Sequence, residues 1–235
     1  MAVPLVISYL LGSIPFGFIV AKARRVDLRK VGSGNIGSTN IYRALGLRTA
    51  LLVFALDAGK GFIGTRVVPA LAPAGPDVNH LRFVCALAVV LGSVASIFMR
   101  FKGGKGVATG AGVFLGLVPL AAAISIARWA GLVAAFKYVS VASLAAACAL
   151  PILVASLDKG PYAYDPVFYL AVAVAVIVFV SHRSNIRRLL LGQEHRVRRT
   201  RHSADEPRGQ AAKEPVDMSA SDRAASSAER ASKEK

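Results

Sequence analysis

Three short polar segments carry most of the side chains in this chain that could do chemistry. The first spans residues 32–43 and contains glycines, hydroxyls and amides, among them Ser33, Asn35 and Asn40, but no carboxylate. Glycine lets backbone N–H groups approach a ligand, and hydroxyl and amide groups add hydrogen-bond donors. Arg43 ends the segment and supplies a bidentate partner for anionic oxygens. The segment is therefore predicted to bind an anion, and phosphate fits it best.

Two further segments add cations, neutral donors and a base. Residues 100–110 place Lys105 among glycines, and residues 181–194 contain His182 and Asn185. The imidazole titrates near neutral pH, and the i, i+3 spacing puts His182 and Asn185 on one face of a helix. This inventory suits a ligand with one or two phosphates.

A metal ion, a cofactor and a nucleotide all fit these segments poorly. Glu194 is the only nearby carboxylate and has no His or Asp at ligand spacing, so no metal site is expected. Gly32-x-Gly34-x-x-Gly37 has the form of a dinucleotide fingerprint, but no βαβ unit surrounds it. Gly104-Lys105-Gly106 lacks the other residues of a Walker A loop. No cofactor is expected.

The elements that must position these segments are membrane helices. Apolar residues make up 54% of the 235, in blocks of about twenty, which predicts an all-α, polytopic membrane bundle. The formal charge of +16 comes largely from basic clusters at the ends of apolar runs. Juxtamembrane positive charge explains such clusters better than nucleic-acid binding does, and it places all three polar segments on the cytoplasmic side.

The predicted spans can be counted from the apolar runs. No Lys or Arg precedes the first run, as would be expected in a cleaved signal peptide, so this run is predicted to stay in the protein as a helix. It is interrupted by a break at residues 12–17. An outer N-terminus and a basic cytoplasmic C-terminus require an odd number of crossings. Splitting the run 107–135 at Pro119 gives seven helices, and a re-entrant 107–135 gives five as the alternative. The predicted runs are 3–21, 50–68, 81–99, 107–135, 137–156 and 167–180.

Two charges fall inside the second run. Asp57 and Lys60 are three residues apart, so they share a helical face and are predicted to pair. Intramembrane charges face the protein interior or a wet cavity, which makes this pair either functional or a structural ion pair. The membrane domain is predicted to span residues 1–195, and the charged remainder, residues 196–235, is expected to be a disordered cytoplasmic tail.

Taken together, the segments resemble the motifs of the bacterial acyl-phosphate:glycerol-3-phosphate acyltransferase family, integral membrane enzymes of phospholipid synthesis. Gly32–Arg43 matches the first motif, with Ser38 where alanine is usual, and Phe101–Thr109 matches the second. His182-x-x-Asn185 through Glu194 matches the third. The resemblance covers residues 1–196. The chain departs from the family at residues 92–96, which read Gly-Ser-Val-Ala-Ser where Gly-His-x-Phe-Pro is usual.

The resemblance implies transfer of a long acyl chain from acyl phosphate to the 1-hydroxyl of glycerol 3-phosphate, giving lysophosphatidic acid and phosphate. By motif match, Ser33 and Lys105 would hold the acyl phosphate, while Arg43, His182 and Asn185 would hold glycerol 3-phosphate. Either His182 or a substrate phosphate would take the proton. Further contacts to the two substrates are predicted from Asn35, Asn40, Gly103, Gly104, Gly106, Thr109, Ser140, Ser143 and Glu194.

Two other functions remain open from the sequence. A transporter of anions or organophosphates would explain a cationic cavity beside an intramembrane ion pair, although no internal repeat is visible. A membrane acyltransferase that uses a thioester donor is the second. None of the four histidines has an aspartate five positions on, so the His-x4-Asp mechanism of other glycerolipid acyltransferases is not expected.

Overall fold

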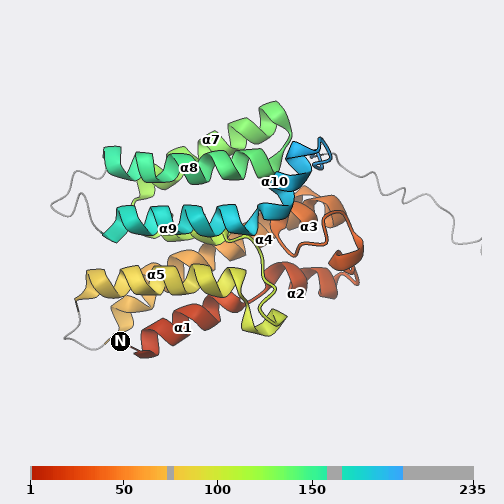
Figure 1. The fold of residues 1–235 in the computed structure, drawn as a ribbon. Helices are drawn as coiled ribbons and strands as arrows, with labels where there is room; N and C mark the ends of the chain where they lie inside the picture. Colours follow the sequence, from red (N-terminus) through yellow and green to blue (C-terminus); the bar gives the residue numbers. More distant parts are fainter. Residues whose placement is uncertain (1, 73–76, 158–165, 198–235) are drawn as a thin grey trace, which may run out of the picture. The chain divides into compact units, whose positions relative to one another are not determined.

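The computed structural model describes residues 2–72, 77–157 and 166–197, and this part of the chain forms helices but no β-strand (Figure 1). The prediction of an all-α fold is confirmed. The chain divides into two units, Met1–Thr200 and Arg201–Lys235, and only the first is described below. Apart from Arg196 and Val197, the predicted tail lies outside the described residues.

Ten α-helices and four shorter helical segments make up the described residues. The α-helices are α1 (Ala2–Ser13), α2 (Phe16–Ala23), α3 (Ser38–Leu45), α4 (Leu47–Phe62), α5 (Val78–Val94), α6 (Val107–Leu117), α7 (Pro119–Phe136), α8 (Val139–Leu157), α9 (Pro166–Ser181) and α10 (Arg183–Leu190). The short segments are η1 (Leu28–Lys30), η2 (Ile63–Val67), η3 (Pro69–Leu71) and η4 (Ile97–Met99).

The predicted break in the first apolar run lies between α1 and α2. Proline 15 lacks an N–H and cannot continue the helix, so nearby carbonyls need other donors. Ser96 Oγ donates to Ser13 O at 2.5 Å, and Lys60 Nζ donates to Ile14 O at 3.0 Å. Two distant parts of the chain, the segment just after α5 and the last turn of α4, therefore hold the break in place.

The second predicted break is also present, because α6 ends at Leu117 and α7 begins at Pro119. Among the described residues, four helices or helix pairs are long and apolar enough to cross a membrane: α1 with α2, α5 with η4, α7, and α8. The α9–α10 pair, bent by 59°, makes a fifth if it counts as one span. Helix α6 is about 16 Å long at about 1.5 Å per residue, half the thickness of a bilayer core.

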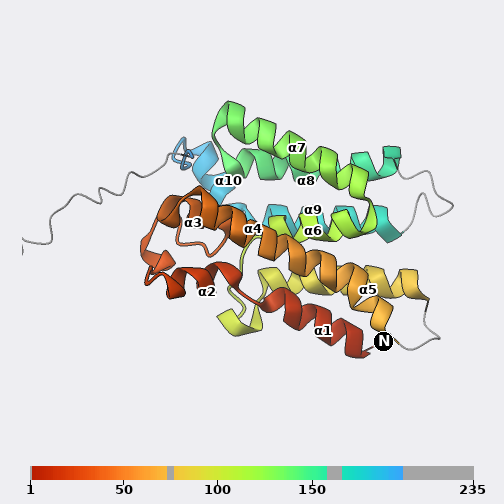
Figure 2. The ribbon, with the colours of Figure 1, turned by 180° about the vertical axis from the view of Figure 1, so that it is seen from behind.

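Close helix packing depends on glycines at two crossings. A Cβ added at Gly112 of α6 would collide with the backbone of Ala58 in α4, and one at Gly12 of α1 would collide with Val89 in α5. These glycines let the backbones touch, as is common in membrane bundles. Helices α1 and α5 thus pack as one pair and α4 and α6 as another, while α8 packs on both α7 and α9 (Figure 2).

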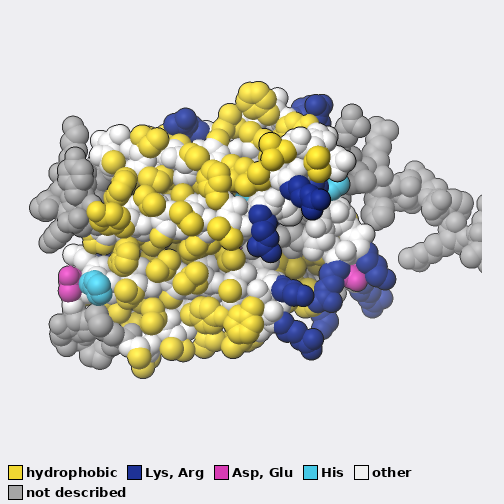
Figure 3. All heavy atoms as spheres, viewed as in Figure 1, with side chains coloured by type: hydrophobic (Ala, Val, Ile, Leu, Met, Phe, Trp, Pro, Cys, Tyr) yellow, Lys and Arg dark blue, Asp and Glu magenta, His cyan; other side chains and the backbone are white. Residues whose placement is uncertain are grey.

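The surface divides into an apolar belt and a basic end. Hydrophobic side chains cover the sides of the helices, and Lys and Arg gather at the end that carries α2 and α10 (Figure 3). Exposed basic residues there include Lys22, Arg24, Arg25, Arg29, Lys30, Arg183 and Arg187. This distribution is that of a multi-pass membrane protein with one strongly basic side.

Candidate active site

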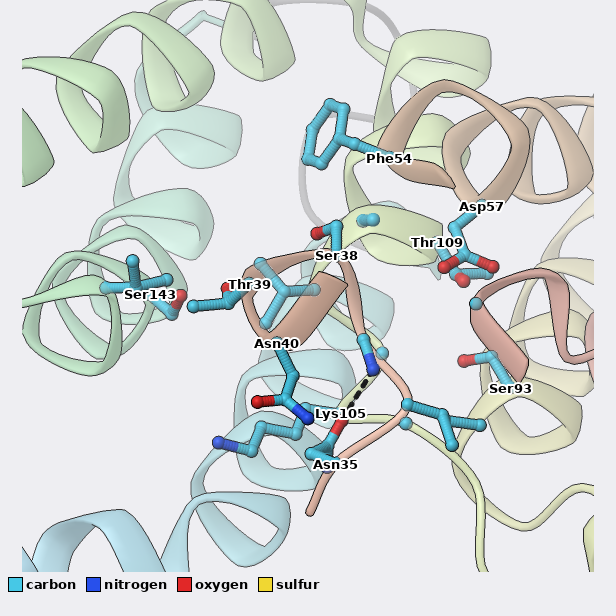
Figure 4. A pocket seen from close by; sticks show the side chains of 18 of the residues that line it. Asn35, Ser38, Thr39, Asn40, Phe54, Asp57, Ser93, Lys105, Thr109 and Ser143 are labelled. Atoms are coloured by element: carbon cyan, nitrogen blue, oxygen red, sulfur yellow. Dashed lines mark hydrogen bonds between the residues drawn. The ribbon is translucent and has the colours of Figure 1, made fainter. Parts of the chain in front are cut away.

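A polar cavity of about 110 Å³ lies toward the basic end of the helices (Figure 4). The three polar segments found in the sequence converge on it, together with the α1–α2 break and parts of α4, α5, α7 and α8. Every predicted site residue except Gly103 lies on its lining. Those on the lining are Ser33, Asn35, Asn40, Arg43, Gly104, Lys105, Gly106, Thr109, Ser140, Ser143, His182, Asn185 and Glu194.

The first segment is held in shape by Asn40, which is 1% exposed. Its Oδ1 accepts from Ser33 N at 3.1 Å, and its Nδ2 donates to Val31 O at 3.0 Å and to Leu28 O at 3.3 Å. Asn40 therefore shapes the loop from inside. Asn35 also stabilises the loop, because its Oδ1 accepts a hydrogen bond from Gly37 N at 2.8 Å (Figure 4).

This loop ends at the N-terminus of α3, whose first residues, Ser38 and Thr39, face the cavity. The N-terminal end of a helix carries unsatisfied N–H groups and a partial positive charge, both of which attract anions. The hydroxyls of Ser33, Ser38 and Thr39 lie beside this end and add donors. The first segment thus presents an anion-binding surface to the cavity.

The second segment brings another helix N-terminus to the same cavity. Gly106, with φ of +76°, precedes α6, and Lys105 beside it reaches into the cavity. The N–H groups of Gly103 and Gly104 donate to Val94 O and Ser93 O, each at 2.9 Å. These two glycines therefore fasten the loop to the end of α5, and Gly103 is packed more closely than Gly104 against the backbone of Ser93 and Val94.

Lys105 belongs to a chain of polar contacts with the third segment. Its Nζ donates to Oδ1 of Asn185, whose Nδ2 donates to Glu194 Oε1 at 2.6 Å. Arg188 Nε donates to Glu194 Oε2 at 2.8 Å, and the Glu194 side chain is only 4% exposed. Both oxygens of Glu194 thus bind neighbouring side chains, and Glu194 fixes the direction of the Asn185 amide.

The charges of the site follow from burial and from these contacts. Burial, opposed by Glu194 and assisted by Arg188 and Arg43, lowers the pKa of Lys105 to about 8. Burial alone would raise the pKa of Glu194, but the hydrogen bonds from Asn185 and Arg188 and the charge of Arg188 outweigh it, and the net shift is downward. Near neutral pH the cavity therefore contains a charged lysine and an ionised Glu194.

His182 follows the last residue of α9 and is 2% exposed. Burial and the charge of Lys105 lower its pKa to about 4, so the ring is neutral at physiological pH. Its Nδ1 lies 2.8 Å from Val178 O, and because a carbonyl can only accept, Nδ1 carries the proton. Nε2 is left as an acceptor in the neutral ring.

Arg43 and the serines of α8 complete the predicted set. Arg43 Nη2 donates to His195 O at 3.3 Å, which ties α3 to the segment after α10. Ser140 and Ser143 are both buried at the start of α8. Ser143 Oγ accepts from Trp129 Nε1 at 3.1 Å, so its partner in this structure is a tryptophan of α7.

Several lining residues were not in the predicted set. Asp57 and Lys60 form the predicted pair, with Oδ1 2.7 Å from Nζ, and both line the cavity. Their position inside an apolar run was the signal that could have placed them there. Ser13, Phe54 and Trp129 also line the cavity, and nothing in the sequence indicated this. Ser93 and Ser96 line it as well, and both lie in the stretch 92–96 where the chain departs from the family motif.

A second cavity of about 70 Å³ adjoins the first and is almost wholly apolar. The two share lining residues, and the second extends among helices α4, α6, α7, α8 and α9. Its other walls are mainly alanines and larger aliphatic or aromatic side chains, including Phe114, Ala122, Ile126, Ala147, Leu150, Val174 and Val178. A charged site thus opens directly onto a hydrocarbon-like space.

The fold and this pair of cavities define a helical membrane protein with an anion site beside a lipid-like pocket. The family model for glycerol-3-phosphate acyltransferase matches residues 2–192, and the chain belongs to that family. A glycerol-3-phosphate acyltransferase of Geobacter sulfurreducens is 44% identical over 190 residues, covering 81% of this chain and 94% of the relative. One from Aquifex aeolicus is 44% identical over 191 residues, covering 81% and 96%.

Two solved structures are similar over the same region. Both are crystal structures of PlsY, described as an integral membrane glycerol 3-phosphate acyltransferase. The glycerol 3-phosphate form is 40% identical with a TM-score of 0.73, and the lysophosphatidic acid form is 39% identical with a TM-score of 0.71. Each covers 82% of this chain and 93% of the PlsY chain. The resemblance found in the sequence is confirmed.

Proposed function

We propose that this chain transfers a fatty acyl group from acyl phosphate to the 1-hydroxyl of glycerol 3-phosphate, giving lysophosphatidic acid and phosphate. The observation that carries the proposal is the junction of a cationic, donor-rich cavity with an apolar one. An acyl phosphate needs both, because its head is a phosphoanhydride and its tail is a hydrocarbon. The family membership supports acyl transfer to glycerol 3-phosphate.

In this proposal each segment of the lining has a role. The N-termini of α3 and α6 bind the phosphate of the donor, with Ser33 and Lys105 beside it. Arg43, His182 and Asn185 bind glycerol 3-phosphate from the other side. Lys105 lies where both phosphates can share its charge, and the acyl tail occupies the apolar cavity.

The reaction then requires only one displacement. The 1-hydroxyl oxygen forms a bond to the acyl carbonyl carbon, and the bond from that carbon to the phosphate oxygen breaks. The hydroxyl proton ends on the released phosphate, either directly or by way of His182 Nε2. Phosphate is a good leaving group, so the transfer is direct and no acyl-enzyme forms. Positioning the reactants and stabilising the developing charge provide most of the rate.

We place this site on the cytoplasmic side of the cell membrane, with seven crossings, the N-terminus outside and the C-terminus inside. The seven crossings count α6 as a crossing although its 11 residues span only about half of a bilayer core. Helix α7 has 18 residues and is long enough to cross, which favours a full crossing over a re-entrant 107–135. Arg196 Nε donates to Tyr138 Oη at 2.9 Å, so α8 begins at the same basic end at which α10 lies. In this proposal residues 1–195 form the membrane domain and residues 196–235 a separate charged tail on the cytoplasmic side.

Thiol labelling in intact cells tests the topology. In a Cys85→Ala, Cys148→Ala background, Val118→Cys is expected to react with an impermeant maleimide added outside. Lys137→Cys should react only after the membrane is opened. A Val118→Cys variant that reacts only from the cytoplasmic side would support five crossings instead.

The activity is tested with purified protein and labelled glycerol 3-phosphate, offered palmitoyl phosphate, palmitoyl-CoA or palmitoyl-acyl carrier protein. Labelled lysophosphatidate is expected from palmitoyl phosphate alone. If lysophosphatidate forms only from palmitoyl-CoA or palmitoyl-acyl carrier protein, the donor is a thioester and not an acyl phosphate. Uptake of labelled glycerol 3-phosphate into vesicles without any acylation would instead show a transporter.

A further inference from the structure

The two cavities share part of their lining, and this shared part is called the neck below. Five residues line both cavities and therefore lie at the junction: Phe54, Gly106, Val107, Trp129 and Ser143. They come from four different helices and the residue before α6, so the neck is built by tertiary packing rather than by one loop. Figure 4 shows Phe54 and Ser143 on different sides of the polar cavity.

An aromatic pair forms one wall of the neck. The rings of Phe54 in α4 and Trp129 in α7 stack with centroids 6.2 Å apart and an angle of 22° between their planes. Trp129 Nε1 also donates to Ser143 Oγ in α8 at 3.1 Å. The indole is therefore held by contacts to two other helices, which fixes its position in the neck.

The aromatic pair joins two helices that are not otherwise packed on each other. Helix α4 packs mainly on α3 and α6, and α7 packs mainly on α6 and α8, so α4 and α7 are not a packed helix pair (Figure 2). The stacked rings bridge the space between them. Gly106, which lines both cavities, has φ of +76°, and the place where its side chain would be lies against Val94 and Val90 of α5, so α5 supports the neck at this point.

We propose that Phe54, Trp129 and Ser143 form a selectivity neck, which admits straight acyl chains and rejects donors with a substituent on the carbon next to the carbonyl. This inference rests on the proposed function. The reacting carbonyl must lie in the polar cavity and the tail in the apolar one, so the first carbons of the chain pass beside the stacked rings, where the two linings meet. Trp129 acts as a specificity-determining residue, and Ser143 holds it in position.

The size of the effect follows from the cost of one misplaced methyl group. An extra methyl group in a fitted apolar site typically changes selectivity by about 10- to 200-fold. The ratio of kcat/KM for palmitoyl phosphate to that for 2-methylpalmitoyl phosphate should therefore be at least about 10 in the unmodified protein. A 2-methyl group also slows acyl transfer intrinsically, but that factor is the same for every variant and cancels between them.

The experiment measures this ratio in five variants, with both donors competing for glycerol 3-phosphate. One of them, Phe54→Leu, removes the ring that stacks on Trp129 and should also lower the ratio. Trp129→Leu is expected to lower the ratio by about tenfold while the KM for glycerol 3-phosphate stays the same. Trp129→Phe keeps a ring in the stack but loses the hydrogen bond to Ser143, so its ratio should lie between those of the unmodified protein and Trp129→Leu. Ser143→Ala removes the hydrogen bond and should give an intermediate ratio. Leu150→Ala is the matched control, because Leu150 lines only the apolar cavity.

An equal ratio in the unmodified protein and Trp129→Leu would overturn the neck. So would a Leu150→Ala variant that lowers the ratio as much as Trp129→Leu does. If Trp129→Leu does not fold, an unchanged ratio in both Ser143→Ala and Phe54→Leu overturns the proposal. Failure of the proposed function looks different, since the unmodified protein would then make no lysophosphatidate from palmitoyl phosphate.

Discussion

Lys105 should give the reaction an alkaline limit near pH 8. Burial lowers the pKa of this lysine to about 8; the nearby Glu194 opposes this shift, and Arg188 and Arg43 add to it. Only the protonated amine can hold the donor phosphate, so binding is complete below the pKa and weakens as the pH rises through it. With a pKa of about 8, the protonated fraction falls about tenfold between pH 7 and pH 9, equivalent to about 1.4 kcal/mol of lost binding.

Neither the substrate phosphates nor His182 accounts for a fall between pH 7 and pH 9. Phosphate monoesters lose their second proton near pH 6, roughly two units below this limit. The pKa of His182 is lowered to about 4, so its ring stays neutral throughout. A fall in kcat/KM for palmitoyl phosphate between pH 7 and pH 9 therefore reports Lys105 in the free enzyme.

Two variants test the assignment. Lys105→Arg keeps its charge above pH 10, so the fall should vanish, although activity drops because a guanidinium does not reproduce the contact to Asn185. Glu194→Gln removes the carboxylate that raises the lysine pKa, so the fall should move to lower pH. The assay follows labelled lysophosphatidate from pH 6 to 10, with hydrolysis of the donor subtracted. A flat profile in the unmodified protein, or an unchanged fall in Lys105→Arg, refutes the reasoning.

Three further predictions concern binding and stability. Arg43→Ala should raise the KM for glycerol 3-phosphate by about 10- to 150-fold, because a charged hydrogen-bond partner contributes about 1.5–3 kcal/mol; steady-state kinetics with an unchanged KM would remove Arg43 from that role. Lys60→Met leaves the Asp57 carboxylate without its cation and should destabilise the fold by about 3–5 kcal/mol. The double variant Lys60→Met, Asp57→Asn should regain part of this stability, because it no longer buries an unpaired charge. Thermal unfolding in detergent measures both, and equal melting temperatures of the single and double variants would argue against the pair. Gly112→Ala places a methyl group against the Ala58 backbone and should cost about 1–3 kcal/mol by the same measurement, whereas Gly131→Ala, where the added carbon meets open space, should not destabilise.

The sequence predicted the features that depend on local chemistry. Apolar runs gave the helices, and Pro15 and Pro119 gave the two breaks, because a missing N–H ends a helix wherever the chain goes. The pairing of Asp57 with Lys60 was predictable from their spacing alone. The convergence of the three polar segments followed from their charge and from their place at the ends of apolar runs.

What the sequence did not reveal depends on tertiary contacts. Asn40 was predicted to touch a substrate, and its amide lines the cavity, but its hydrogen bonds run inward to the loop. The hydroxyl of Ser96 binds Ser13 O, a contact that a proline at this position could not make. Trp129 carried no signal, since a lone tryptophan in an apolar helix reads as lipid-facing or core until its neighbours are known.

The central claim is that both substrates occupy one cavity and that the acyl group passes between them directly. Rapid mixing of the protein with palmitoyl [³²P]phosphate tests this claim, with and without glycerol 3-phosphate, by counting phosphate released per protein in the first turnover. The account predicts no initial release without glycerol 3-phosphate, and equal rates of phosphate and lysophosphatidate formation with it. One equivalent of phosphate released at once without the acceptor would reveal an acyl-enzyme and contradict the account.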